Sequence, residues 1–335
     1  MSFIKKASAW KAAIAGAAAS LALVGTASAQ TQWVMASGYP ENNFMTQNLR
    51  KWVEEVEKGT SGKLKITLHT NDSLIKLDSI KSAVQRGQVQ GGEIRLGVYG
   101  NEDPMYILDG VPFLASTYEE AWKLMEAQNP YFKGLFDKAG MVIAGYQVWP
   151  SQGFFTKFQV KSVEDFKDKK IRIYSTATQR MATLLGFKAT ILPFAEIPQA
   201  FSTGLIEALF TSAQTGTDIQ AWDNTKYFTD VGAILSKNAL IFNKRAFAAL
   251  SPADQKIVLD AAAAYTKRSW EMSKAAGDEK AAVLKKNGMI VEGGPPAVVA
   301  AMKKVGVTMA DEWKATASPA AVAILNAYMA GQKTN

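Results

Sequence analysis

The stretch Lys170-Ile171-Arg172-Ile173-Tyr174, together with the segments behind it, decides the fold of this chain. Apolar and polar residues alternate through these five positions, which is typical of a strand with two different faces. A helical segment, a short apolar run at residues 189–192, a turn, a second helical segment and an apolar run ending at Thr211 follow. This order of strands and helices predicts an open α/β fold.

Arg172 lies in this first strand among apolar neighbours. In an open α/β sheet, ligands bind at the carboxyl ends of the strands, and a guanidinium group there can match a carboxylate with two parallel hydrogen bonds. The alternative is that Lys170, Arg172 and Tyr174 form the solvated face of an ordinary strand. The five residues alone favour this second interpretation.

The order of motifs around this strand resembles the second domain of substrate-binding proteins from tripartite ATP-independent periplasmic (TRAP) transporters, the DctP-type family. The matching segments are Lys170-Ile171-Arg172, Leu185-Gly186-Phe187, Leu192-Pro193-Phe194-Ala195-Glu196, Ala200-Phe201-Ser202-Thr203-Gly204 and Ile206-Glu207-Ala208. The resemblance extends roughly from Trp33 to Gly288. It implies a two-domain periplasmic binding protein fold with a ligand cleft between the domains, a long helix spanning both, and Arg172 as the partner of a ligand carboxylate.

The first 29 residues have the pattern of a secretory signal peptide. Three lysines precede an apolar run from Ala12 to Val24, and Ala27-Ser28-Ala29 follows as a small-x-small cleavage site. The apolar run is too short, and too rich in Ala and Gly, for a membrane anchor helix. We therefore expect cleavage after Ala29 and a periplasmic mature protein.

Composition narrows the class of protein further. The chain has 335 residues, 48% hydrophobic and 20% charged, which suits two globular domains. It contains no cysteine, so disulfides, thiolate zinc sites and cysteine nucleophiles are excluded. The formal net charge of +8 is spread along the chain without a basic block, and we expect no nucleic-acid partner.

The resemblance also implies the domain organisation. We expect a first domain from residues 30–152 and 241–277, and a second from residues 153–240 and 278–335. Strand, helix and strand patterns from Trp33 to His69 predict a parallel βαβ start. The helical pattern of residues 252–286 suits the long helix that the resemblance implies, and two helices broken near Gly277 are the alternative.

Charged residues occur inside a predicted strand that covers residues 89–99. By strict alternation, Glu93 and Arg95 share one face with Gly97 and Tyr99. Charged side chains inside a parallel strand need a partner or a wet cleft. Two alternatives stay open, namely an ion pair between Glu93 and Arg95 and contact of these side chains with ligand.

Departures from the family pattern bear on the ligand. Phe155 stands where many relatives carry a second ligand-contacting arginine, and Thr211 stands where some carry an asparagine. The further candidate contacts are Asn43, Trp149, Phe154, Phe194 and Gln214. Exchange of a guanidinium group for a phenyl ring removes a carboxylate partner and adds apolar area. We therefore expect a monocarboxylate with an apolar or aromatic body; a C4-dicarboxylate or keto acid is the alternative if Arg95 faces the cleft free of Glu93.

The sequence is compatible with two classes of function, a solute-binding protein and a secreted enzyme. The motifs Gly-x-Ser-x-Gly, His-Glu-x-x-His and Gly-x-x-x-x-Gly-Lys are absent, and His69 is the only histidine. We expect no catalysis, no cofactor and no metal. The expected protein is a monomer that captures a small organic acid by domain closure and delivers it to the TRAP membrane permease subunits.

Overall fold

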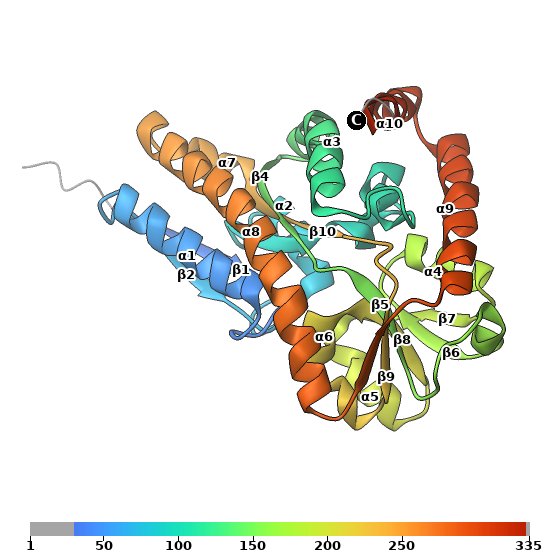
Figure 1. Ribbon diagram of the computed structural model, residues 1–335. Helices are drawn as coiled ribbons and strands as arrows, with labels where there is room; N and C mark the ends of the chain where they lie inside the picture. The colour runs from blue at the N-terminus through green and yellow to red at the C-terminus, as the bar shows by residue number, and fades with distance from the viewer. Residues whose placement is uncertain (1–29, 333–335) are drawn as a thin grey trace, which may run out of the picture.

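The computed structural model describes residues 30–332, which form two β-sheets with helices around them (Figure 1). The predicted signal peptide, residues 1–29, lies outside these residues. The mixed α/β architecture with two sheets confirms the predicted fold class. The predicted domain limits stay a prediction.

The first sheet has the strand order β2-β1-β3-β10-β4. Its strands are β1 (Thr31–Ala36), β2 (Leu64–His69), β3 (Gly91–Arg95), β4 (Met141–Val148) and β10 (Lys237–Asn243). β1 pairs in parallel with β2 and β3, and the helix α1 (Phe44–Gly59) connects β1 to β2, so the predicted βαβ start is confirmed. β10 runs antiparallel to both of its neighbours and brings the chain back from the second sheet.

The second sheet has the strand order β11-β9-β5-β8-β6-β7. Its strands are β5 (Gln152–Thr156), β6 (Lys170–Ile173), β7 (Lys188–Ile191), β8 (Ala208–Ser212), β9 (Tyr227–Asp230) and β11 (Ile290–Gly293). The residues Lys170–Ile173, for which the sequence predicts a strand, form β6, which lies parallel to β7 and β8.

The remaining helices cover the two sheets. They are α2 (Ile80–Gln85), α3 (Tyr118–Lys138), α4 (Thr176–Leu184), α5 (Ile197–Ser202), α6 (Ala213–Asp218), α7 (Lys244–Ala248), α8 (Pro252–Lys286), α9 (Pro296–Thr316) and α10 (Pro319–Gln332). The chain after α8 contacts helices beside both sheets. α9 packs on α4, which follows β6 of the second sheet, and α10 packs on α3, which precedes β4 of the first sheet.

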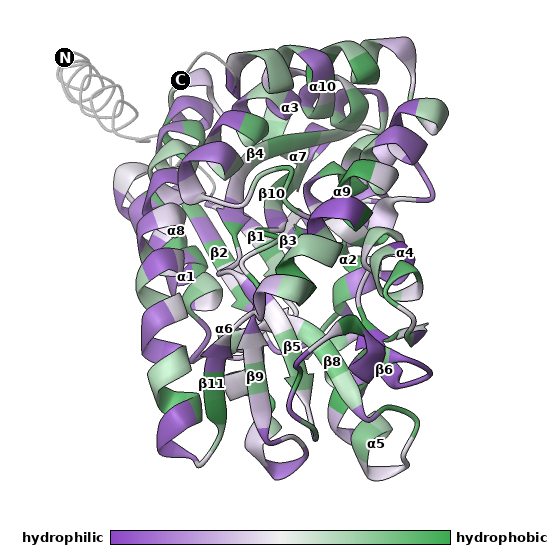
Figure 2. Cartoon of the chain, turned by 45° about the vertical axis from the view of Figure 1, so that its right-hand side comes forward, coloured by the Kyte–Doolittle hydropathy of each residue, from purple (hydrophilic) through white to green (hydrophobic). Residues whose placement is uncertain are grey.

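The helix α8 is continuous over 35 residues, so the alternative of two helices broken near Gly277 is wrong. Ser251 caps its first turn by accepting a hydrogen bond from the backbone N–H of Asp254, and Pro252 occupies the first helical position. α8 contacts α1 and β4 on the side of the first sheet and α6 and β11 on the side of the second (Figure 1). Hydrophilic and hydrophobic residues alternate along it, as expected for a helix with one face on the core (Figure 2).

The predicted strand at residues 89–99 is wrong in its second half. β3 ends at Arg95, and Leu96–Tyr99 form the 3-10 helix η2. η2 packs on the 3-10 helix η3 (Pro104–Gly110), and the ring of Tyr99 lies 5.7 Å from that of Tyr106. Because the chain leaves the sheet at Arg95, Arg95 stands at the carboxyl end of a strand.

Candidate functional site

A cavity lies between the two sheets. The carboxyl ends of the parallel strands β1 and β3 face it from one sheet, and those of β6 and β8 face it from the other. The lining residues are Tyr39, Arg95, Trp149, Gln152, Arg172, Tyr174, Phe194, Thr211, Ser212, Thr215 and Ser236. This is the position at which open α/β sheets bind ligands.

Arg172 is buried beside this cavity, with a relative exposure of 1%. The solvated-face interpretation of the strand is therefore wrong for Arg172 and for Tyr174, which is also buried. The Nε of Arg172 donates a hydrogen bond to the carbonyl oxygen of Leu192 at 3.0 Å, whereas its Nη2 has no partner among residues 30–332. A buried N–H without a partner is costly, so a ligand acceptor would be favourable here.

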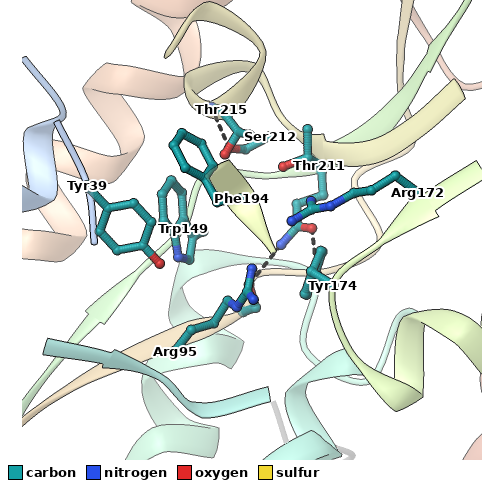
Figure 3. A pocket seen from close by; sticks show the side chains of 11 residues that line it. Tyr39, Arg95, Trp149, Arg172, Tyr174, Phe194, Thr211, Ser212 and Thr215 are labelled. Carbon is teal, nitrogen blue, oxygen red and sulfur yellow. Dashed lines mark hydrogen bonds between the residues drawn. The ribbon is translucent and has the colours of Figure 1, made fainter. Parts of the chain in front are cut away.

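A second arginine approaches from the other sheet. The guanidinium groups of Arg95 and Arg172 lie 5.6 Å and 5.7 Å from the centre of the Tyr174 ring (Figure 3). Burial, and then the positive charge of Arg95, lower the pKa of Arg172 to about 9, so Arg172 is still cationic at neutral pH. No acidic side chain lines the cavity among the described residues, so the site attracts anions.

Arg95 is not paired with Glu93. Its nearest acidic partner is Asp78, with Nη2 3.2 Å from Oδ1, and its Nε has no partner among the described residues. Glu93 instead accepts hydrogen bonds from Ser37, which follows β1, and from Gln147 and Asn238 on β4 and β10 of the first sheet. The alternative of an ion pair between Glu93 and Arg95 is therefore wrong, and Glu93 does not line the cavity.

Three aromatic side chains form one wall of the cavity (Figure 3). The ring of Tyr39 lies 5.1 Å from that of Trp149 and 5.9 Å from that of Phe194, both in edge-to-face geometry. The Nε1 of Trp149 donates to the Oδ1 of Asn238, whose Nδ2 donates to Tyr39 and Glu93. Glu93 thus supports this wall from behind, and burial raises its pKa.

Neutral polar groups form the rest of the lining. The hydroxyl of Tyr174 donates to the Oε1 of Gln152 at 2.6 Å, and the Nε2 of Gln152 donates to the Oγ of Ser236 at 2.9 Å. Thr211 lies at the end of β8, and the Oγ of Ser212 caps α6 by accepting from the backbone N–H of Thr215. These groups can bind uncharged polar atoms of a ligand.

The structure brings five of the predicted site residues to the cavity, namely Arg95, Trp149, Arg172, Phe194 and Thr211. Sequence reasoning missed Tyr39, Gln152, Tyr174, Ser212, Thr215 and Ser236. Of these residues, Gln152 begins β5, Tyr174 follows β6, Ser212 ends β8 and Ser236 precedes β10. The rule that ligands bind at strand ends could have found those on the parallel strands.

The structure places the other predicted contacts elsewhere. Phe155 points to the opposite side of β5 from Phe154 and stacks on Phe228, with ring centres 4.4 Å apart. Phe154 packs in a separate ring cluster with Phe166, Phe187 and Phe210. Asn43 and Gln214 hydrogen-bond to Asp218 and do not line the cavity.

Among residues 30–332, no helix has both the length and the apolar composition that a membrane span requires. No group of three or more His, Cys, Asp or Glu side chains is arranged there to hold a metal ion.

Comparisons with known proteins agree with this geometry. The profile of the DctP family, described as bacterial extracellular solute-binding protein, family 7, matches residues 35–316. Among solved structures, DctP7, a Bordetella pertussis extracytoplasmic solute receptor binding pyroglutamic acid, is 40% identical, with a TM-score of 0.87, over 89% of this chain and 99% of its own. DctP6 from the same organism, also binding pyroglutamic acid, is 39% identical, with the same TM-score and coverage.

A third structure comes from a marine metagenome, a TRAP solute-binding protein specific for pyroglutamate and solved with the co-purified ligand. It is 33% identical, with a TM-score of 0.86, and covers 90% of this chain and 99% of its own. These folds are those of substrate-binding proteins rather than enzymes. The chain therefore belongs to family 7 of the bacterial extracellular solute-binding proteins, the DctP family, whose members bind small organic acids in the periplasm and work with a TRAP membrane permease.

Proposed function

We propose that this protein captures a small cyclic monocarboxylate, with pyroglutamate as the first candidate, and delivers it to a TRAP permease without chemical change. The observation that carries the proposal is the unpartnered Nη2 of buried Arg172 at a cavity with an aromatic wall and a neutral polar lining. Three similar proteins, 33% to 40% identical, bind pyroglutamate or pyroglutamic acid.

The ligand carboxylate pairs with Arg172 in this proposal. The guanidinium group is already held by Leu192, so little side-chain entropy is lost when the anion binds. Arg95 adds positive charge from the opposite domain, and its Nε is a second free donor. A carboxylate that reaches both arginines would attract the two domains toward each other.

The body of the ligand lies between the aromatic wall and the polar lining. The ring methylenes of pyroglutamate are apolar and suit the rings of Tyr39, Trp149 and Phe194. Its lactam carries one N–H donor and one carbonyl acceptor, which suit hydroxyl and amide partners such as Thr211 and Gln152. This assignment keeps the predicted monocarboxylate with a partly apolar body, but the body contacts do not include Phe155.

A C4-dicarboxylate or keto acid is the second candidate, because Arg95 faces the cavity free of Glu93. The contact of Arg95 with Asp78 weakens this candidate, since Asp78 already offsets part of the charge that a second carboxylate would need. The first candidate requires no second charged partner.

Capture occurs by closure of the two domains around the ligand. In this proposal β4, β5 and β10, which lie where the chain passes between the sheets, bend while α8 flexes. Closure removes water and so strengthens the charge-assisted hydrogen bonds. The mature protein is exported after cleavage at Ala29, is a monomer and presents its closed form to the permease.

Isothermal titration calorimetry on the mature protein tests the ligand class. We expect binding of pyroglutamate and no comparable binding of proline, because proline carries an ammonium group for which the cavity has no acidic partner among the described residues. Succinate and 2-oxoglutarate are the comparison set. Tight binding of only these dicarboxylates would refute the monocarboxylate assignment and support the second candidate.

A further inference from the structure

Asp218, the last residue of α6, connects the two halves of the molecule. Its Oδ2 accepts a hydrogen bond from the Nδ2 of Asn43 at 2.8 Å, and its Oδ1 accepts one from the Nε2 of Gln214 at 2.7 Å. Asn43 caps α1 beside the first sheet, where its Oδ1 accepts from the backbone N–H of Met45. Asn43 and Gln214 are both fully buried and Asp218 is half-buried, so contacts from both sides shield part of its carboxyl group from water.

The same two segments also line the ligand cavity. The loop before α1 carries Tyr39 and Asn43, and α6 carries Thr215 near its start and Asp218 at its end. Separation of the two sheets at the cavity would therefore separate Asn43 from Asp218. Opening would expose the carboxyl group to water, and closure would bury it.

We propose that Asp218 couples domain closure to protonation: its carboxyl group takes up a proton as Asn43 and the first domain enclose it, so that ligand capture is tighter at mildly acidic pH. This inference rests on the proposed function, in which the two domains close around an organic acid. Asp218 lies outside the cavity and acts through closure, not through contact with the ligand.

The electrostatics set the sign of this coupling. Burial raises the pKa of Asp218 to about 6, and the hydrogen bonds from Asn43 and Gln214 oppose this rise only in part. In the open form, water restores a pKa near the ordinary value of about 3.9. The closed form therefore binds more protons between these two values, and a fall from pH 7 to pH 5 raises the ratio of closed to open protein roughly tenfold.

Gln214 can serve both protonation states. The amide nitrogen of Gln214 donates to Asp218, while its Oε1 is buried without a partner among the described residues. Rotation of this amide by half a turn would bring the oxygen to the carboxyl group, where it could accept the proton of neutral Asp218.

Other titratable groups near Asp218 are few. Of the elements packed on α6, α8 presents Lys280, whose charge lowers the pKa of Asp218, and the 3-10 helix η6 (Ala221–Asp223) contains Asp223. β5 and β8 contain no titratable side chain. The loop before α1 contains Glu41, which pairs with Arg50.

Spin labels test the coupling without any ligand. The chain contains no cysteine, so Lys51→Cys on α1 and Thr203→Cys after α5 give one labelled pair on exposed positions of opposite halves. Electron–electron distance measurements on the ligand-free protein should show a larger closed fraction at pH 5 than at pH 7. Asp218→Asn should remove this response, and the exposed matched control Asp223→Asn should keep it. An unchanged pH response in Asp218→Asn would overturn the inference.

Gln214→Met gives a second variant that keeps the carboxyl group. Loss of one donor should raise the pKa of Asp218 further and move the pH midpoint of closure upward. This shift is a readout that a merely structural role of Asp218 would not produce. A midpoint unchanged from that of the wild type would contradict the assignment.

Calorimetry with pyroglutamate in buffers of different ionisation enthalpy completes the test. Binding by the wild type at pH 6 should take up about 0.5 proton, and binding by Asp218→Asn should take up none from this group. If the wild type does not bind pyroglutamate, the proposed ligand is wrong and the spin-label experiment still decides the role of Asp218. If both proteins bind with equal proton uptake, the inference about Asp218 is wrong and the proposed ligand stands.

Discussion

Replacement of Arg172 by methionine separates the role of this side chain in binding from its role in stability. Methionine is unbranched and apolar, so it can fill much of the buried space of the arginine stem. It removes the unpartnered Nη2 at the cavity and the hydrogen bond from Nε to the Leu192 carbonyl. Loss of the Nη2 group should lower the affinity for ligand, whereas loss of the hydrogen bond to Leu192 should affect the stability of the ligand-free protein.

Binding should fall steeply in this variant. Truncation of one partner of a buried charged pair costs about 2 to 5 kcal/mol, which corresponds to a loss of pyroglutamate affinity between about 30-fold and 4,000-fold. Isothermal titration calorimetry measures this loss. Arg180→Met is the matched control, because Arg180 lies on α4 outside the cavity and pairs with Glu312, with 45% of its side chain exposed.

The free energy of unfolding of the ligand-free variant should not fall by a similar amount. Loss of the Leu192 hydrogen bond costs about 1 kcal/mol, but a buried cation without an acidic partner costs several kcal/mol in the wild type. The lowered pKa of Arg172 has the same origin, because burial disfavours its charged form. Urea denaturation without ligand should therefore give a free energy of unfolding no lower than that of the wild type. Wild-type affinity in Arg172→Met, or its severe destabilisation, would refute this reasoning.

Three further predictions concern the wall, the core and export. Trp149→Phe removes the donor to the Asn238 Oδ1 and should lower the free energy of unfolding in urea by about 1 to 3 kcal/mol. An unchanged free energy of unfolding would show that a water molecule replaces the indole N–H as the donor to Asn238. Gly216→Ala should cost about 1 to 3 kcal/mol in the same assay, because its Cβ would lie 2.2 Å from the Phe155 ring, whereas the open position Gly134 should tolerate alanine. Amino-terminal sequencing of the exported protein should begin at Gln30, and a chain that retains Met1 would contradict the predicted cleavage.

Local sequence patterns determined the elements and their order. The alternation at Lys170–Ile173 predicted β6, and the periodicity from Pro252 to Lys286 predicted α8, because strand and helix periods are properties of neighbouring residues. The ordered motifs also identified the family and led to Arg172. The cap at Ser251 was predictable for the same local reason.

Only the tertiary structure decided which side chains meet. Alternation places Glu93 and Arg95 on one face of β3, but Arg95 contacts Asp78 from the segment before α2, and Glu93 contacts Gln147 and Asn238 from β4 and β10. Alternation likewise could not say which face of β5 is directed toward the ligand cavity, and Phe155 occupies a core closed by α6 instead. A strand period specifies two faces, whereas the partners of each face come from segments distant in sequence that pack only when the chain folds.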